Sequence, residues 1–237
     1  MEKQNNITGP ESLTQQGCRF DALVMPPSRI LDLFCKAGGA SMGLHQAFPD
    51  AEIFGVDKDY QKNYPFNFIQ ADAMTFDLNG YDFIWASPPC QFYSNLTPQE
   101  HKSKHPALIG SVRKRLQKTK SIWIIENVNG AKKHLYNPIM LCGTQFGLNT
   151  HRHRYFESPW LDIVMMPSCD KSIIPVVVSG TSKRLFNGKR REFTAQECGE
   201  AMQINWMTRK ELDEAIPPAF SKYLIAEIYR RLQIRAA

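Results

Sequence analysis

Short apolar runs in the N-terminal half are the feature that most constrains the fold of this chain. The five runs are Arg29–Phe34, Glu52–Val56, Phe68–Gln70, Phe83–Ala86 and Ser121–Ile125. Apolar runs of this length, bounded by turn residues, are typical of buried strands. Segments with helical character lie between some of them, and strands that alternate with helices favour a parallel sheet. We therefore predict an α/β fold.

Polar side chains follow the second to fifth of these runs, at the point where each predicted strand ends. They are Asp57, Asp72, Cys90 and Glu126. In open α/β sheets, ligands bind at the carboxyl ends of the strands. Acids or a thiol after four consecutive strands therefore predict a functional site at this edge of the sheet.

Cys90 is the candidate nucleophile at this edge. Pro88 and Pro89 end the preceding strand, because proline cannot donate to a strand ladder and fixes its own φ. A cysteine on such a stiff turn is well placed to act as a thiolate nucleophile. The alternative is a buried structural cysteine, and the Pro-Pro-Cys sequence alone leaves both open.

A glycine-bearing turn after the first run predicts a cofactor site. Gly38 and Gly39 lie in the turn 35–43, which opens a helix ending near Ala47. Glycines let the backbone approach a ligand closely, and a helix N-terminus favours anionic groups. Asp57 follows about twenty residues later, where nucleotide-binding sheets place the carboxylate that takes ribose hydroxyls. The pair indicates a nucleotide-like cofactor.

Two basic blocks account for much of the formal net charge of +6. The first block holds Lys102, Lys104, Arg113, Lys114, Arg115, Lys118 and Lys120, and the second holds Lys183, Arg184, Lys189, Arg190 and Arg191. Such blocks suit a polyanionic partner. A solvated helix face and a polar loop would give the same composition, so both interpretations stay open on charge alone.

The 237 residues suffice for one domain, or for one domain with a small appendage. No apolar run reaches the ~20 residues that span a bilayer, and the polar N-terminus lacks a signal-peptide core. We expect an intracellular protein. The six cysteines form no CxxC pair, which predicts free thiols and no metal site.

The later part of the chain is expected to continue the helical layers and then break the α/β rhythm. Apolar spacing predicts a helix around Leu108–Leu116 with its basic face outward, after a polar lid at Phe92–His105. The other expected elements are a helix at 138–146, a strand after Arg154, a strand at Val176–Val178, a hairpin turned at Asn187-Gly188, a helix from Thr194 to Met207 and a closing helix at Tyr223–Leu232.

In this order, these elements resemble the DNA cytosine-5 methyltransferases, most closely the short bacteriophage-type enzymes with a reduced target-recognition region. The matching motifs are Asp32-Leu33-Phe34 with Gly38-Gly39, the acids Asp57 and Asp72, Pro88-Pro89-Cys90-Gln91, Glu126-Asn127-Val128 and Arg152-His153-Arg154. The resemblance covers most of residues 29–230. The cysteine, Glu-Asn-Val and Arg-x-Arg motifs are specific in combination, although no single one is.

The resemblance implies a Rossmann-like, S-adenosylmethionine-dependent methyltransferase sheet with a small, reduced target-recognition lobe. The implied enzyme is a DNA (cytosine-5-)-methyltransferase that acts through a covalent Cys90–C6 adduct on a flipped-out cytosine. Glu126 would hold N3 and the exocyclic amine, Arg154 would bind O2, and Arg152 would support the pocket. A structural ion pair is the alternative for the acid and the two arginines.

The same resemblance assigns binding residues and an organisation. The implied cofactor-binding residues are Asp32, Phe34, Gly38, Gly39, Asp57, Lys58, Asp72, Ala73 and Pro88. The implied nucleic-acid-binding residues are Ser94, Lys102, Lys104, Arg113, Lys183, Arg184, Arg190 and Arg191. We expect an arm at 1–27, a catalytic domain at 28–157, a recognition lobe at 158–193 and completing helices at 194–237. DNA is the expected partner, with RNA less favoured. We expect a monomer that binds no metal and contacts no membrane. Its expected location is the cytoplasm, or the host cytoplasm if the protein is phage-encoded.

Three positions depart from the family pattern. Lys36 replaces a usual glycine of the cofactor loop, Glu214 replaces a frequent asparagine, and Thr150 replaces the glutamine ahead of Arg-x-Arg. Lys36 would either meet the cofactor carboxylate or point to solvent. Two alternatives to DNA methylation remain: the same chemistry on RNA, and a catalytically silent nucleic-acid-binding relative.

Overall fold

The computed structural model describes residues 25–161, 166–178, 184–186 and 189–236. Most of the predicted N-terminal arm, the turn Asn187-Gly188 and Lys183 lie outside the described residues.

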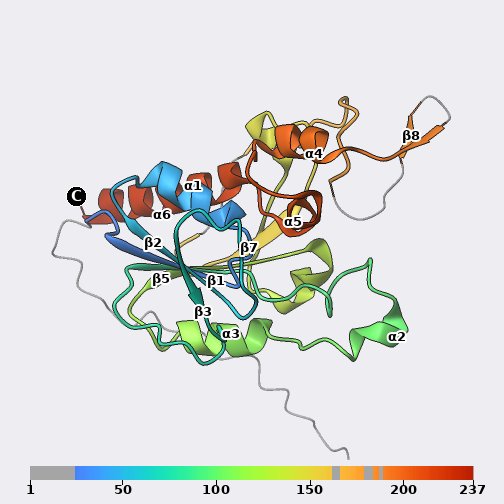
Figure 1. Cartoon of the computed structure of the whole chain (residues 1–237). Helices are drawn as coiled ribbons and strands as arrows, with labels where there is room; N and C mark the ends of the chain where they lie inside the picture. The colour runs from blue at the N-terminus through green and yellow to red at the C-terminus, as the bar shows by residue number, and fades with distance from the viewer. Residues whose placement is uncertain (1–24, 162–165, 179–183, 187–188, 237) are drawn as a thin grey trace, which may run out of the picture.

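A seven-stranded sheet forms the centre of the molecule (Figure 1). Its strands are β1 (Arg29–Leu33), β2 (Glu52–Asp57), β3 (Asn67–Gln70), β4 (Phe83–Ala86), β5 (Ile122–Asn127), β6 (Ile139–Leu141) and β7 (Arg154–Glu157). The order is β3-β2-β1-β4-β5-β7-β6, with β1 to β5 parallel and β7 antiparallel to both neighbours. The α/β prediction and the five predicted N-terminal strands are confirmed, each within a residue or two of its expected bounds.

The strand order reverses between β1 and β4, which are hydrogen-bonded neighbours. Crossovers leave β1 toward one edge of the sheet and β4 toward the other, so their connecting loops diverge. A crevice forms outside the carboxyl ends of strands at such a switch point. The turn after β1 and the Pro-Pro-Cys turn after β4 border this crevice.

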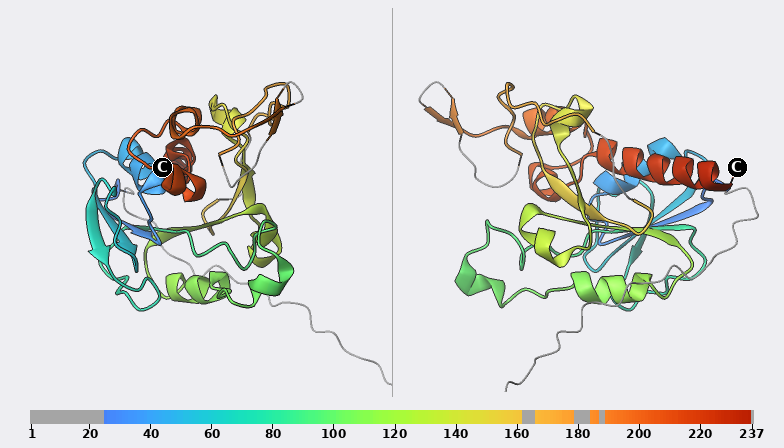
Figure 2. Two further views of the ribbon diagram at one scale, coloured as in Figure 1. Left: turned by 45° about the vertical axis from the view of Figure 1, so that its right-hand side comes forward. Right: turned by 180° about the vertical axis from the view of Figure 1, so that it is seen from behind.

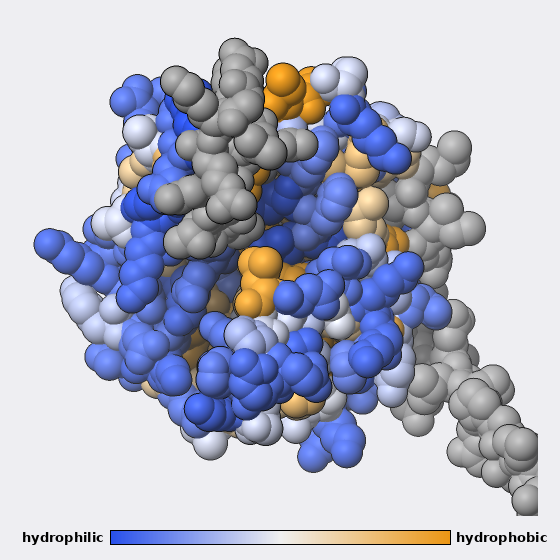
Figure 3. Space-filling model, turned by 90° about the vertical axis from the view of Figure 1, so that its right-hand side faces the viewer, coloured by the Kyte–Doolittle hydropathy of each residue, from blue (hydrophilic) through white to orange (hydrophobic). Residues whose placement is uncertain are grey.

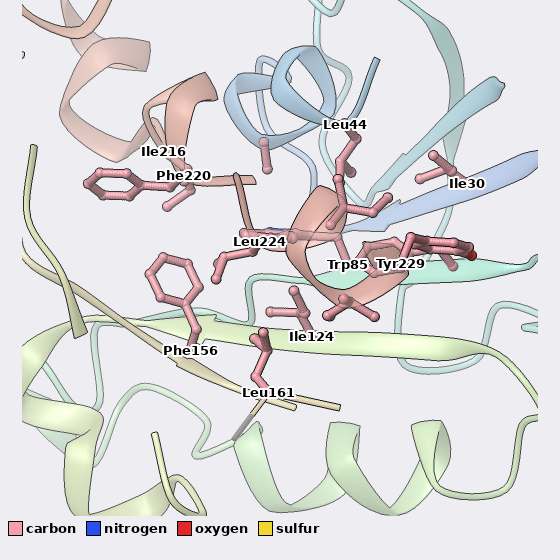
Figure 4. Packing of buried hydrophobic residues seen from close by; sticks show 14 of the residues in the cluster. Ile30, Leu44, Trp85, Ile124, Phe156, Leu161, Ile216, Phe220, Leu224 and Tyr229 are labelled. Atoms are coloured by element: carbon pink, nitrogen blue, oxygen red, sulfur yellow. The ribbon is translucent and has the colours of Figure 1, made fainter. Parts of the chain in front are cut away.

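Helices cover both faces of the sheet. α1 (Gly39–Ala47) and α6 (Pro218–Ala236) lie on one face, and α3 (Ile109–Leu116) lies on the other (Figures 1 and 2). The core between α6 and the sheet includes Trp85, Phe156 and Phe220, all fully buried (Figure 4). Apolar side chains on both faces explain why β4 is a continuous buried run, as parallel central strands are.

α1 and α6 pack against each other at close range because of a glycine. A Cβ at Gly43 would lie 2.0 Å from the carbonyl oxygen of Pro218 and 2.2 Å from Oγ of Ser221. The Ser221 hydroxyl donates to the carbonyl of Ala40 at 2.7 Å. No side chain larger than hydrogen fits at Gly43 without separating the two helices.

Two short helices precede α6, and each begins at a capping box. α4 (Ala195–Met202) is capped by Thr194, whose hydroxyl accepts from the backbone N–H of Glu197, as predicted. α5 (Arg209–Glu214) is capped in the same way by Thr208 and Glu211. The remaining elements are α2 (Gln99–Lys102), the 3₁₀ helices η1 (Asn129–His134) and η2 (Gly143–Phe146), and the antiparallel strands β8 (Arg184–Phe186) and β9 (Lys189–Arg191).

The pairing of β8 with β9 confirms the predicted hairpin, whereas four other predictions need correction. The helix predicted from Thr194 to Met207 ends at Met202, because Gln203 adopts a left-handed conformation with a φ of 58°. The segment 138–146 is not a helix: β6 pairs with β7 at the sheet edge, and η2 follows. Val176–Val178 form no strand, and Val176 makes a single backbone bond to Asn149. The closing helix is longer than predicted and begins at Pro218, since proline fits the first turn of a helix.

Among the helices that the structure describes, none has both the length and the apolar character needed to cross a membrane.

Candidate active site

The loops that follow β1, β2, β3, β4 and β5 surround a cavity of about 430 Å³. This volume falls within the range of small-molecule and cofactor sites, which is about 300–1,000 Å³. Its polar and charged lining residues include Asp32, Lys36, Asp57, Lys58, Asp59, Asp72, Ser87, Cys90, Glu126, Arg154, Asp213 and Glu214. Residues from all four predicted strand ends therefore meet in one cavity.

Hydrogen bonds fix the turn that carries Cys90. The side-chain amide of Asn127 donates to the carbonyl of Pro88 at 2.8 Å, which joins the end of β5 to the Pro-Pro turn. The carbonyl of Cys90 accepts from the backbone N–H groups of Tyr93 and Ser94 at 2.9 and 2.8 Å. Glycine at 130 leaves room for this loop, because a Cβ there would lie 2.0 Å from the Tyr93 carbonyl oxygen.

The buried Glu126 forms an ion pair with the partly buried Arg154 beside Cys90. Oε1 of Glu126 lies 3.1 Å from Nε of Arg154, yet this oxygen accepts no hydrogen bond from a described residue. Burial raises the pKa of the Glu126 carboxyl, and Arg154 partly opposes that rise. The raised pKa favours the protonated form of this carboxyl, and the oxygen without a described hydrogen-bond partner can serve a ligand.

Burial also raises the pKa of the Cys90 thiol, and the charge of Glu126 raises it further, whereas Arg154 lowers it. The two acids are coupled through space, because a negative charge on one disfavours ionisation of the other. A proton on Glu126 therefore makes the thiolate of Cys90 easier to form.

Arg152 holds the wall of the cavity and is buried, with 8% of its surface exposed. Its Nε donates to the carbonyl of Ala215 at 2.9 Å, and its Nη2 donates to the carbonyls of Asp213 and Ala215 at 2.7 and 2.6 Å. Burial lowers the pKa of its guanidinium, and the nearby charge of Arg154 lowers it further. Arg152 thus ties the segment before β7 to the loop between α5 and α6.

The predicted cofactor carboxylates Asp57, Asp72 and Asp32 also line the cavity. Asp57 accepts from the backbone N–H groups of Lys36 and Asp59 at 3.2 and 3.1 Å, and Asp72 accepts from Met74 at 2.8 Å. These bonds leave acceptor capacity on both carboxylates.

Asp32 is fully enclosed at the end of β1. One of its oxygens accepts from the Ser41 hydroxyl at 2.5 Å, and that hydroxyl also lies 2.8 Å from the hydroxyl of Tyr64. The other oxygen, Oδ1, has no partner among the described residues. Burial, reinforced by the charge of Asp57, raises the pKa of Asp32 to about 7.

Two of the departures from the family pattern, Lys36 and Glu214, contact each other. The Lys36 ammonium lies 3.8 Å from Oε2 of Glu214 and 3.9 Å from Oδ2 of Asp59, and all three side chains are partly exposed. Lys36 also adopts a positive φ of 46°, a conformation that favours glycine. Both residues line the cavity, so the ion pair bridges two of its walls.

The other predicted cofactor residues lie around the same space. Phe34, Gly39, Lys58, Ala73 and Pro88 line the cavity, whereas Gly38 caps the start of α1 with a φ of 80°. The loop Asp213–Ile216 also lines it. The resemblance placed residues 195–220 at the late helix and closing cofactor segment, but none of them was among the predicted cofactor-binding residues. The Thr208-x-x-Glu211 signature of a capping box could have predicted α5, which delivers this loop.

Apart from Arg113, the predicted nucleic-acid residues that the structure describes lie at three places. Ser94 lies in the turn after Cys90, Lys102 is the last residue of α2, and Lys104 follows it in the next turn. α2 and the β8–β9 hairpin extend from the same side of the molecule (Figures 1 and 2), and the described surface on this side is mostly hydrophilic (Figure 3). Arg184 and Arg190 lie on the hairpin, and Arg191 pairs with Glu197 at the start of α4.

Arg113 corrects the prediction of an outward basic face on α3. Its side chain is 8% exposed, and its guanidinium donates to both oxygens of Glu157 at 2.5 and 2.6 Å. Arg115 on the same helix donates to the carbonyls of Ala73 and Phe76. Two of the basic side chains are therefore used inside the fold, while Lys114 and Lys118 stay exposed.

Residues 28–141 match the family model of C-5 cytosine-specific DNA methylases. The match includes Cys90 and Glu126 and ends before Arg152 and Arg154. It supports a methyltransferase. No curated protein matches the sequence.

Solved structures give the fold. A methyltransferase of Entamoeba histolytica, EhMeth, is 16% identical over 88% of this chain and 99% of that chain, with a TM-score of 0.56. The plantazolicin methyltransferase BpumL, solved with a pentazolic desmethylPZN analog and SAH, is 21% identical over 44% of this chain and 40% of that chain. Its TM-score of 0.32 is too low for an inference about this chain. The predicted fold class is thus confirmed: the chain has the Rossmann-like sheet of S-adenosylmethionine-dependent methyltransferases.

Proposed function

We propose that this protein transfers a methyl group from S-adenosylmethionine to C5 of cytosine in DNA through a covalent adduct between Cys90 and C6. The observation that carries the proposal is the meeting of Cys90, Glu126 and Arg154 in the cavity that also holds the strand-end acids. The family match over residues 28–141 supports the same chemistry.

The cavity fits the proposed cofactor in both its polar groups and its walls. Asp57 and Asp72 offer free acceptor capacity for ribose hydroxyls and for an adenine amine, and Phe34 and Leu108 add apolar wall. The unpartnered Oδ1 of the buried Asp32 can accept from the cofactor's amino group. When bound, the cofactor supplies an electrophilic methyl group next to the base.

Cys90 performs the activating step, because C5 of cytosine is a poor nucleophile. The thiolate sulfur forms a bond to C6, and the electron pair of the 5–6 double bond shifts toward C5 and, through C4, toward N3, which makes C5 nucleophilic. C5 then takes the methyl group. Loss of the C5 proton to a base such as water returns the electrons, re-forms the double bond and expels the Cys90 thiolate.

Glu126 and Arg154 stabilise the base as charge develops on it. When the thiolate adds, the protonated oxygen of Glu126 donates its proton toward N3. The second carboxyl oxygen of Glu126 accepts a hydrogen bond from the exocyclic amine. Arg154 binds O2 of the base while paired with Glu126. Arg152 acts indirectly by holding Asp213 and Ala215 against the cavity.

DNA would approach the side that carries α2 and the hairpin. C6 of cytosine is inaccessible inside a duplex, so the target base must leave the stack to reach Cys90. Lys102 and Lys104 would contact the phosphates, and residues 158–193 would form a small recognition lobe that reads a short site. We keep the predicted division into an arm, a catalytic domain, this lobe and completing helices as part of the proposal.

The test is a trapping experiment with DNA that contains 5-fluorocytosine. Fluorine cannot leave as a cation, so a Cys90–C6 adduct should persist as a denaturant-stable complex that requires S-adenosylmethionine. Cys90→Ala should abolish it, whereas Cys198→Ala, which changes a buried cysteine on α4, should retain it. Trapping by Cys90→Ala would refute the covalent mechanism. Trapping on RNA of matched sequence but not on DNA would show that the substrate is RNA, and the proposed covalent chemistry would remain.

A further inference from the structure

Two thiols and an imidazole meet outside the candidate active site. Cys142 caps η2, His153 precedes β7, and Cys169 lies in the described segment 166–178. One ligand atom from each of the three residues lies within 4.8 Å of the other two. Their spacing in the sequence matches no metal-binding motif, so the sequence predicted no metal site. The three side chains are brought together by the fold.

The separation of two of these atoms fits a shared tetrahedral ion. Sγ of Cys169 lies 3.6 Å from Nε2 of His153. Zinc binds cysteine sulfur at about 2.3 Å and histidine nitrogen at about 2.0–2.1 Å, and a tetrahedral angle then separates the two ligand atoms by about 3.6 Å. The pair is therefore already spaced as zinc requires.

Hydrogen bonds hold the Cys169 segment in place from both sides. The backbone N–H of Asp170 donates to the Thr144 hydroxyl at 3.0 Å, and the Gln145 amide donates to the carbonyl of Pro167 at 2.7 Å. Nε2 of His151 lies 3.0 Å from the carbonyl oxygen of Asp170. These contacts fix the backbone on either side of Cys169 against η2, so the thiol position does not depend on a bound ion.

We propose that Cys142, His153 and Cys169 bind a zinc ion, with water as the fourth ligand. Two thiolates and one imidazole form a donor set that selects zinc over magnesium or calcium. Binding displaces the two thiol protons to solvent and involves no oxidation or reduction. The described residues supply three ligands.

The proposed ion would fasten the segment 166–172 to the catalytic sheet. His153 stands between Arg152 and Arg154, so an ion bound to its ring also restrains the strand start that presents both arginines. This segment opens the stretch that leads toward the hairpin. The site would therefore set the position of that stretch relative to the cavity, whichever reaction the cavity carries out.

The experiment uses the full chain, purified under reducing conditions, stripped of metal and titrated with Zn²⁺ and Co²⁺. The wild-type protein should bind about one ion per chain, and Co²⁺ should give the near-ultraviolet charge-transfer band of thiolate ligands. Cys169→Ser and His153→Gln change partly or fully exposed side chains, so both variants should fold and lose most of the binding. Cys198→Ala is the matched control, because it removes a cysteine far from the cluster in sequence and should keep the band.

Thermal unfolding gives a second readout. Free zinc at about 100 times its dissociation constant should raise the Tm of the wild type by about 5–10 °C and leave that of Cys169→Ser unchanged. The proposal is overturned if the reduced wild type shows no thiolate band, or if Cys169→Ser keeps it. Loss of two hydrogens on mild oxidation, without metal binding by the reduced protein, would identify a Cys142–Cys169 disulfide pair and would also overturn it.

Discussion

The ion pair between Arg113 and Glu157 makes a sharp prediction, because the sequence assigned Arg113 to the DNA surface. Both side chains are almost fully buried, at 8% and 4% exposure. The guanidinium also donates to the carbonyl of His134 at 2.6 Å and lies 3.9 Å from the ring centroid of Tyr136. The pair therefore joins α3 to β7 and η1.

Arg113→Met keeps the apolar stem and removes the charge. It leaves the buried carboxylate of Glu157 with one described partner, the backbone N–H of Tyr136 at 2.9 Å. Breaking a buried ion pair on one side costs about 3–5 kcal/mol. For a chain of this size, each kcal/mol corresponds to about 2–4 °C, so we expect the Tm to fall by about 6–20 °C.

Urea unfolding of Arg113→Met and Lys114→Met measures the difference. Lys114 is the exposed next residue, and its substitution removes the same formal charge with a change of only about 0.5 kcal/mol or less. The double variant Arg113→Met/Glu157→Leu should be more stable than Arg113→Met, because no charge is left buried. If Arg113→Met is as stable as Lys114→Met but binds DNA more weakly, the structural role is wrong and the DNA-surface assignment is right.

Three further predictions concern the cavity. Glu126→Gln should lower turnover by ~10² or more and change cofactor affinity little, whereas Asp57→Ala should weaken cofactor binding and change turnover at saturation little. Steady-state kinetics and calorimetry of cofactor binding measure the two effects, and the same pair of changes in both variants would contradict the division into two subsites. Because burial raises the pKa of Asp32 to about 7, the folded protein holds a proton that the unfolded chain releases near pH 4. The contribution of Asp32 to the free energy of unfolding of the cofactor-free protein should therefore be largest below pH 4, and it should fall by up to about 4 kcal/mol as the pH rises through 7. Urea unfolding as a function of pH should show a smaller fall in stability for Asp32→Asn, and the same fall as in the wild type would refute the prediction. If the Lys36–Glu214 pair bridges the cavity walls, Lys36→Met and Glu214→Gln should accelerate cofactor dissociation by a similar factor in stopped-flow measurements, and by a larger factor at low salt. Weaker cofactor binding in Lys36→Met with tighter binding in Glu214→Gln would instead indicate that Lys36 contacts the cofactor carboxylate.

The sequence predicted the elements whose signal is local. β1 to β5 are continuous apolar runs, and the polar residues at their ends reach one edge because the strands are parallel. Cys90, Glu126 and Asp57 therefore met in the cavity as the strand pattern indicated. The capping of α4 by Thr194 also depends on residues within one turn.

The features that the sequence did not predict depend on partners far along the chain. Arg113 resembled its exposed neighbours because Glu157 lies 44 residues away. The segment 138–146 has apolar residues compatible with a helix, but Ile139–Leu141 find an open sheet edge at β7 and pair with it. Cys142 and Cys169 looked scattered for the same reason: only the fold sets them beside His153.

The packing of α6 on α1 has a consequence for the order in which the chain can mature on the ribosome. Phe220, Leu224 and Ile228 complete a core whose other side, including Leu44, is made from the start of the chain. At translation rates of about 5–20 residues per second, this apolar surface waits about 10–40 s for its cover. Nascent chains should therefore need chaperone protection during that interval. A stop codon just before Pro218 would abolish function even though every residue assigned to the chemistry had been translated.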